Sequence, residues 1–161
     1  MADDPELAVR RPEAVAAVPL SFGLFALSRA LHTYGTALLA DLGLHPGQEL
    51  IIMYLFDAEE ASASEMIAEL SLDHSTVSRS LVRMEKAGLI TRSPSITDRR
   101  KVLARLTPRG LSLRRPLQDL WSAVEATVTA PLATGEQETL HGLALRVEDA
   151  LTRARRISAS V

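Results

Sequence analysis

Apolar residues recur at spacings of three and four along most of the chain, which is the period of an amphipathic α-helix. The first apolar stripe predicts a helix over residues 20–41 that ends at Gly43, a residue suited to the left-handed backbone that follows a helix. A second helix is expected to begin near His45 and Pro46, because proline is tolerated in a first helical turn, and to stop before Ala58.

The next segment predicts two short helices separated by a tight turn. Ser62 and Glu65 have the spacing of a capping box, in which each side chain bonds the other's backbone N–H. Asp73 is a favourable N-cap for the second helix, and Gly88 is a favourable end for it. The pattern therefore predicts a helix-turn-helix whose recognition helix covers residues 73–87.

A hairpin is expected after the recognition helix. Residues 89–92 and 101–107 have the composition of short strands, and the polar residues 93–100 connect them as a loop. A two-stranded hairpin in this position is the wing of a winged helix-turn-helix.

Two long helices are predicted in the C-terminal part. Thr107 and Pro108 give a cap followed by a proline at the first helical position, and Pro116 is expected to kink the helix that they start, because its nitrogen carries no hydrogen. Thr134 and Gln137 have the spacing of a cap for the last helix.

Together these elements predict a mainly α fold, a winged helix-turn-helix with a two-stranded wing and N- and C-terminal dimerisation helices. Residues 1–18 show no sustained period and are interpreted as an N-terminal arm of uncertain order, followed by one domain over residues 19–158. Within that domain we expect a DNA-binding lobe over about 45–110 and dimerisation helices over about 20–41 and 108–157. A homodimer is expected because the apolar stripes of these helices exceed what one three-helix lobe can bury.

Composition narrows the functional classes. The sequence has no run of 18 apolar residues and no signal-peptide pattern at its start, so we expect a cytoplasmic protein without a membrane partner. It contains no cysteine, which excludes disulfides, thiolate metal sites and any sensor that works by cysteine oxidation.

The basic residues are concentrated in one segment. Residues 74–115 carry eleven Lys and Arg against two acidic residues, a net charge of +9, although the whole chain carries −2. A solvated helix face usually mixes both signs of charge, whereas a block of one sign fits a polyanionic partner.

One face of the predicted recognition helix has the side chains that read DNA. Its apolar positions share a narrow arc, and the opposite arc offers arginines for guanine or phosphate and hydroxyls for phosphate or base edges. An ordinary solvated surface is the alternative, but the preceding helix and turn favour DNA recognition. The predicted DNA-binding residues of this helix are Ser75, Thr76, Ser78, Arg79, Arg83 and Lys86.

The predicted wing adds a second basic cluster, formed by Asp98, Arg99, Arg100 and Lys101. An arginine at a loop tip suits a narrow minor groove, where the negative potential is enhanced. Asp98 lies two residues from Arg100 and is expected to orient its guanidinium. The alternative is an ordinary turn with a local ion pair.

The sequence favours no enzyme, cofactor or metal site. Asp73, His74 and Ser75 are the residue types of a hydrolytic triad, but neighbours on a helix point about 100° apart and cannot form its geometry. The four histidines are isolated, and none has the spacing of a zinc site. They are His32, His45, His74 and His141.

Three segments together resemble the MarR family (multiple antibiotic resistance regulators). They are residues 72–79 and 81–90 of the helix-turn-helix, and the wing residues 98–103 with 106–110. The resemblance covers roughly residues 20–155. It implies a homodimer with two winged lobes that read an inverted repeat, often a small ligand that releases DNA, and a D-x-R wing motif matched by Asp98 and Arg100.

These observations predict a homodimeric, sequence-specific regulator that represses transcription from a pseudo-palindromic operator of double-stranded DNA. Two alternatives stay open: a winged-helix module that docks on a protein, and a nucleoid-type protein without sequence preference. If a small effector exists, an apolar or aromatic-acid molecule is expected between the first, second and fifth helices. The residues expected near it, which are equally well explained as core or interface, are His32, Tyr34, Met53, Phe56 and Trp121.

Overall fold

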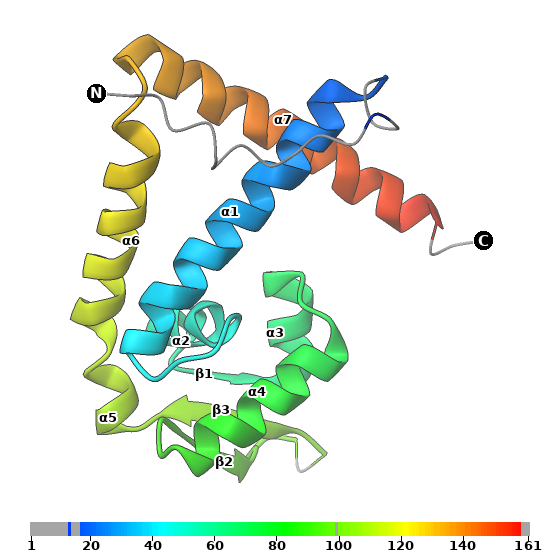
Figure 1. Cartoon of the computed structure of the whole chain (residues 1–161). Coiled ribbons are helices and arrows are strands. Elements are labelled where there is room, and N and C mark those ends of the chain that lie inside the picture. The colour runs from blue at the N-terminus through cyan, green and yellow to red at the C-terminus, as the bar shows by residue number, and fades with distance from the viewer. Residues whose placement is uncertain (1–12, 14–16, 99, 159–161) are drawn as a thin grey trace. The chain divides into compact units, whose positions relative to one another are not determined.

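The protein is mainly helical with one small sheet (Figure 1). A computed structural model describes residue 13 and residues 17–98 and 100–158. Most of the predicted arm, residues 1–18, and the predicted wing residue Arg99 lie outside these described residues. The elements in chain order are α1 (Pro19–Asp41), α2 (Gln48–Ala58), β1 (Glu60–Ser62), α3 (Ala63–Leu70), α4 (His74–Lys86), β2 (Ile90–Pro94), β3 (Val102–Leu106), α5 (Pro108–Leu111), α6 (Arg114–Thr129) and α7 (Thr134–Ser158).

The chain divides into two units, Met1–Gln118 and Asp119–Val161. The first unit holds α1 to α5, the sheet and the start of α6. The second unit holds the rest of α6 and all of α7. No helix in the described ranges combines the length and the apolar content that a membrane span requires.

The first two helices follow the predicted stripes with one correction. α1 ends as predicted, with Gly43 in the left-handed region at φ 69°. α2 begins at Gln48 and not at the predicted Pro46. The reason is a turn held by two bonds between His45 and Gln48, one from the Gln48 N–H to the His45 carbonyl and one from the His45 N–H to the Gln48 side chain. Gly47, at φ 88°, then occupies the N-cap position.

The predicted helix-turn-helix is present as α3 and α4. Ser62 and Glu65 form the capping box, with the Glu65 carboxylate accepting a bond of 2.7 Å from the Ser62 N–H. The turn between the helices passes through Ser71, whose φ is 53°. Asp73 caps α4, and Gly88 follows its C-terminus at φ 70°. Both helix ends therefore lie where the capping residues predict.

The sheet has three strands in the order β1-β3-β2, all antiparallel, where the sequence predicted two. The wing hairpin pairs Ile90 with Leu106 at its base and Pro94 with Val102 at its far end. The additional strand β1 pairs Ala61 with Ala104. Three residues are too few to show a strand period, which is why the pattern did not predict β1.

The hydrophobic core of the first unit joins the helix-turn-helix to α2 and the sheet. Ile51 and Ile52 of α2, Met66 of α3 and Met84 of α4 are fully buried. Ile90 of β2 is also buried, which anchors the base of the wing to this core. The recognition helix and the wing are therefore fixed to one apolar centre.

Two predictions in the C-terminal part are wrong in detail. Pro116 does not kink a continuous helix, because α5 stops at Leu111 and α6 begins at Arg114. A proline nitrogen cannot donate to the carbonyl four residues earlier, but in the first turn of a new helix it needs no partner. Thr134 and Gln137 do not form the cap of α7. The Glu136 carboxylate instead accepts from the Ala133 N–H, and the Gln137 amide donates to backbone carbonyls, one of them that of Leu132.

Candidate nucleic-acid interface

The N-terminus of α4 is organised around the carboxylate of Asp73. Its Oδ1 accepts from the Ser75 hydroxyl at 2.6 Å and from the Thr76 N–H at 2.9 Å, and its Oδ2 accepts from the Thr76 hydroxyl at 2.5 Å. The two hydroxyl bonds and the backbone bond hold the pKa of Asp73 below its usual range. An ionised carboxylate is therefore part of the exposed face where α4 begins.

The solvent face of α4 carries the predicted reading side chains. Val77, Leu81 and Met84 are buried beneath it, as the helical period predicts. Arg79 is exposed but lies back along its own helix, where Nε donates to the Ser75 carbonyl and Nη2 to the Ser75 hydroxyl, both at 3.0 Å. The exposed side chains of the predicted set on this helix are Ser75, Ser78, Arg79, Arg83 and Lys86, with Thr76 half-buried.

The C-terminus of α4 is tied to the corner between β3 and α5. The Thr107 hydroxyl donates to the Gly88 carbonyl at 2.6 Å, and Arg109 donates to the Ala87 carbonyl at 2.9 Å. Gly110 packs so closely that a Cβ on it would lie 2.2 Å from the Leu89 carbonyl oxygen. These contacts fix the direction of the recognition helix relative to the wing.

Two ion pairs join the wing to the helix-turn-helix. Arg92 of β2 pairs with Glu85 of α4, with 2.7 Å between Nη2 and Oε2. Lys101 pairs with Glu65 of α3, with 3.5 Å between Nζ and Oε1. The bonds from Ser62 and the nearby Lys101 charge lower the pKa of Glu65. Lys101 was predicted to contact DNA, but in this structure its ammonium group lies beside a carboxylate of the lobe.

The wing loop presents Arg100 to solvent, as predicted. Asp98 does not act on it in the predicted way, because its Oδ1 accepts the backbone N–H of Arg100 at 3.1 Å and not the guanidinium. A second backbone bond runs from the Lys101 N–H to the Asp98 carbonyl at 2.9 Å. Asp98 therefore orders the turn that carries Arg100.

The predicted effector residues are divided between the two units. His32 and Tyr34 are exposed on α1, Met53 is exposed on α2, and Trp121 belongs to the second unit. The ring of Phe56 is covered by the Arg114 guanidinium, which lies 4.3 Å from the ring centroid. Arg114 also donates to the Phe56 carbonyl at 3.1 Å.

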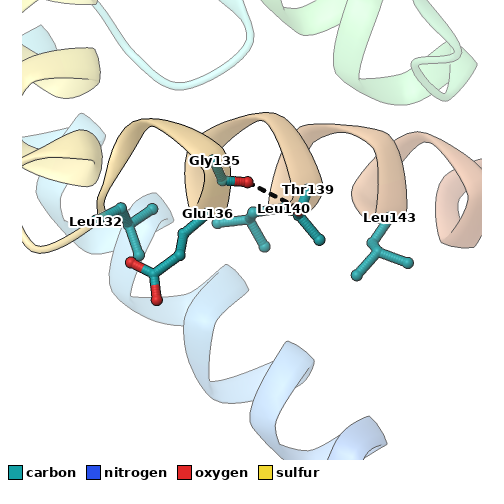
Figure 2. A pocket seen from close by; sticks show the side chains of 6 residues that line it. All are labelled: Leu132, Gly135, Glu136, Thr139, Leu140 and Leu143. Atoms are coloured by element: carbon teal, nitrogen blue, oxygen red, sulfur yellow. Dashed lines mark hydrogen bonds between the residues drawn. The ribbon is translucent and has the colours of Figure 1, made fainter.

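A shallow hollow of about 320 Å³ lies elsewhere, at the N-terminal end of α7 (Figure 2). None of the five predicted effector residues lines it. Figure 2 shows its lining residues, among which the Thr139 hydroxyl donates to the Gly135 carbonyl. They are Leu132, Gly135, Glu136, Thr139, Leu140 and Leu143.

The first unit also contains a buried carboxyl group that the sequence did not single out. Glu49, in the first turn of α2, is buried, and its Oε2 has no hydrogen-bond partner among the residues that the structure describes. Burial raises the pKa of Glu49, while bonds from the backbone and the charge of His32 act in the opposite direction. Across the ranges that the structure describes, no three His, Cys, Asp or Glu side chains gather as metal ligands would.

Several residues that shape the interface were missed by sequence reasoning. Glu85, Arg92 and Arg109 position the helix and wing through partners distant in sequence, so no local pattern reveals them. Ile96 in the wing loop is 96% exposed. Its signal in the sequence was an isoleucine within an otherwise polar loop.

Comparison with known proteins points to one class of regulator. A sequence model of the MarR family matches residues 42–101. The chain is 37% identical over 101 residues to an organic hydroperoxide resistance transcriptional regulator of Bacillus subtilis, covering 63% of this chain and 69% of that protein. It is 32% identical over 101 residues to the HTH-type transcriptional regulator MgrA of Staphylococcus aureus, covering 62% and 69%.

The fold has counterparts among solved structures. One is a cysteine-to-serine mutant of MarR from E. coli complexed with operator DNA, which superimposes with a TM-score of 0.76. The match covers 85% of this chain and 99% of that chain at 22% sequence identity. At this identity the comparison establishes the winged-helix architecture.

Proposed function

The chain belongs to the MarR family of transcriptional regulators, and on this premise we propose that it is a homodimeric repressor that binds a pseudo-palindromic operator in double-stranded DNA. One observation carries the proposal. The exposed arginines of α4 and the exposed Arg100 of the wing belong to one segment, residues 74–115, whose net charge is +9. Such a segment suits a helix in the major groove and a wing over the adjacent backbone or minor groove.

Base reading is assigned to α4 and groove-shape reading to the wing. Arg79 lies opposite the buried side chains of α4, and Arg83 and the Ser78 hydroxyl are exposed on the two flanks of that face, where a major groove would meet them. Arg100 projects from a turn ordered by Asp98. The remaining proposed contacts, Ser75, Thr76, Lys86 and Lys101, surround these residues and suit phosphates.

Dimerisation is proposed through the terminal helices. The apolar stripe of α1 is solvent-exposed in the single chain and includes Leu20, Leu24 and Leu31. On α7 the exposed stripe includes Leu140 and Leu143. Contiguous apolar stripes of this length are seldom left in water, so a second copy of the chain is proposed to cover them.

The test is binding of the full chain to duplex DNA from its own upstream region, against random duplex of equal length. We expect nanomolar retention of the upstream duplex, a marked preference over the random one, and a footprint over two symmetric half-sites. A footprint over one asymmetric half-site contradicts the operator proposal. Equal binding to both duplexes identifies a nucleoid-type protein, and no DNA binding identifies a protein-docking module.

Repression is tested by transcription in vitro from the same upstream region. A dimer that occupies a promoter excludes polymerase, so added protein is expected to lower transcript yield with the same concentration dependence as operator binding. An increase in transcript yield would reverse the assignment to an activator.

An effector is proposed as an apolar or aromatic acid bound near His32, Tyr34, Met53 and Phe56 of the first unit. The support is chemical: the half-buried ring of Phe56 and the Arg114 cation over it suit a ring that carries a carboxylate. A screen of aromatic acids for release of operator DNA tests this. Hits that act equally on wild type, Tyr34→Phe and Phe56→Ala would place the pocket elsewhere.

A further inference from the structure

The tip of the wing presents a large apolar side chain to water. Ile96 is 96% exposed, and the next most exposed large apolar side chain among those described, Leu20, is 73% exposed. Leu20 belongs to a helical stripe that a second copy is proposed to cover, whereas Ile96 stands alone in a loop. A single exposed apolar residue is common on protein surfaces, so its exposure carries no argument without the geometry around it.

That geometry is a constructed turn. Ser95 is only 7% exposed, and its hydroxyl oxygen accepts from the N–H groups of Thr97 and Asp98, each at 3.3 Å. The Ser95 N–H donates to the Lys101 carbonyl at 2.9 Å, which closes the loop. The loop is therefore held on both sides of Ile96, and the isoleucine projects outward from a fixed backbone.

The surroundings of Ile96 indicate what it meets. Arg100 is exposed in the same loop, and Lys101 next to it and Arg92 of β2 add two cations that are ion-paired with Glu65 and Glu85. A polyanion is the partner that this charge fits. The minor groove of DNA offers apolar deoxyribose walls between two rows of phosphates, and proteins that enter it commonly place isoleucine or leucine there.

We propose that Ile96 is a DNA-contacting residue that packs against the sugars and base edges of the operator's minor groove, beside the contact of Arg100. This inference rests on the proposed DNA-binding function. A β-branched side chain on a fixed turn loses little conformational freedom when it is buried, so the contact adds affinity at small entropic cost. In this proposal the turn around Ser95 holds both Ile96 and Arg100 in position for DNA.

An apolar contact differs from a cationic one in its thermodynamic behaviour. It releases no counterions, so its loss lowers the logarithm of the affinity by the same amount at every salt concentration. Burial of apolar surface makes the heat-capacity change of binding more negative. Both properties separate Ile96 from the arginines around it.

The experiment measures binding of the full chain to its upstream duplex for wild type, Ile96→Ser, Ile96→Val and the control Val102→Ser. Val102 is a 51% exposed apolar residue at the far end of the same hairpin. We expect about tenfold weaker binding for Ile96→Ser, because both wings of the dimer lose most of an isoleucine contact. Ile96→Val should restore most of the affinity, and Val102→Ser should bind as wild type.

Three further readouts accompany the affinity. The slope of log affinity against log salt should be unchanged in Ile96→Ser, and its heat-capacity change of binding should be less negative. The thermal midpoint should equal that of wild type, because the Ile96 side chain is 96% exposed. Diaminopurine in place of adenine beside the half-sites puts an amino group into the minor groove, where Ile96 is proposed to pack. The difference in affinity between wild type and Ile96→Ser should therefore be smaller on this duplex.

The outcomes separate this inference from the proposed function. Wild-type affinity in Ile96→Ser, with wild type still selecting its upstream duplex, overturns the assignment of Ile96 and leaves the regulator intact. An altered salt slope, or an undiminished difference on diaminopurine duplex, also overturns it. Failure of wild type to bind any duplex overturns both proposals together.

Discussion

Arg79 and Arg100 carry the same charge, but their surroundings differ, and the proposed function gives them different contacts with DNA. The Arg79 guanidinium is bonded to the Ser75 hydroxyl and carbonyl within one helical turn, so it reaches DNA only by exchanging those bonds. Arg100 stands on a turn whose backbone Asp98 holds. A base-reading contact and a groove-shape contact leave different marks on binding, which makes the two residues separable.

Arg79→Ala is expected to weaken operator binding by roughly 1–3 kcal/mol per half-site and to relax the preference at one base pair, because a bidentate contact to guanine discriminates by that amount. The measurement is affinity for a panel of operators with single base-pair changes. Equal weakening on every sequence, random duplex included, would mean that Arg79 contacts the DNA backbone. Base reading would then have to come from Ser78 or Arg83.

Arg100→Ala is expected to weaken binding to operator and random duplex alike. Each lost phosphate neutralisation removes about 0.9 from the slope of log affinity against log salt, hence up to about twice that for a dimer. Titrations over a salt series measure the slope, with Arg79→Ala as the comparison. A variant with wild-type affinity and slope would show that the wing does not meet DNA through this residue.

Glu49 gives stability a pH dependence. Burial raises its pKa, so the folded chain holds this proton more tightly than the unfolded chain does. The contribution of this proton to stability is complete below the pKa of Glu49 in the unfolded chain. It is lost as pH rises through the raised pKa of Glu49 in the folded chain. Urea denaturation over a pH series should show that the free energy of unfolding of wild type falls relative to that of Glu49→Gln as pH rises. A constant difference between the two would contradict the assignment.

Local chemistry predicted some residues of the interface and could not predict others. The polar face of α4 follows from helical period alone, because Val77, Leu81 and Met84 must be buried on the opposite side. The pairing of Lys101 with Glu65 depends on the approach of the wing to α3, which no local pattern encodes. Sequence reasoning therefore identifies the exposed polar face of a helix more readily than it identifies which cations of the lobe are already paired.

Among the elements, the connection between recognition helix and wing depends on one close approach. Gly110 lies so near the Leu89 carbonyl that a methyl group there must displace backbone, which cannot move as a flexible side chain does. The bonds from Thr107 and Arg109 to the end of α4 converge on the same corner. A substitution at this corner should therefore change both the stability of the fold and the direction of α4.

Gly110→Ala is expected to cost about 1–3 kcal/mol of unfolding free energy, as overpacking of a tight site does, and to weaken operator binding as well. Gly142→Ala on α7 is the matched control, since a Cβ there meets nothing within 4 Å. Alanine in an open helical position is expected to stabilise by roughly 0.5–1 kcal/mol. Urea midpoints measure the change in stability of both variants, and equal stability of the two would contradict the packing argument.

Element boundaries were predictable where a single residue type determines them. Asp73, Gly43 and Gly88 end or begin helices at the predicted positions because capping and left-handed backbone are local properties. β1 was not predictable, since three residues acquire strand geometry only by pairing with β3. Pro116 was interpreted as a kink, but the earlier turn at the end of α5 left it in the first turn of a new helix.

At the scale of the whole molecule, charge and apolar surface are separated along the chain. Residues 74–115 carry the excess of positive charge, while the rest of the chain is net negative. The large exposed apolar side chains outside the lobe lie mainly on α1 and α7. A protein with this distribution is suited to meet a polyanion through one part and a copy of itself through another.

The dimer is tested by two leucines of α7 that point in different directions. Leu143 belongs to the stripe shared with Leu140, whereas Leu145, two residues later, lies about 200° around the helix. Both are about half exposed in the single chain. Glutamate at position 143 would bury an unpaired charge at a dimer interface, which is strongly unfavourable, whereas glutamate at position 145 would stay in water.

We expect light scattering to give twice the 17.5 kDa chain mass for wild type and Leu145→Glu, and a large monomer fraction for Leu143→Glu at micromolar concentration. Because one lobe contacts only one half-site, Leu143→Glu should also lose the symmetric footprint while circular dichroism still reports a helical fold. A monomeric wild type would refute the dimer. A dimeric Leu143→Glu would move the interface off this stripe, and the half-site spacing would then depend on other surfaces of the terminal helices.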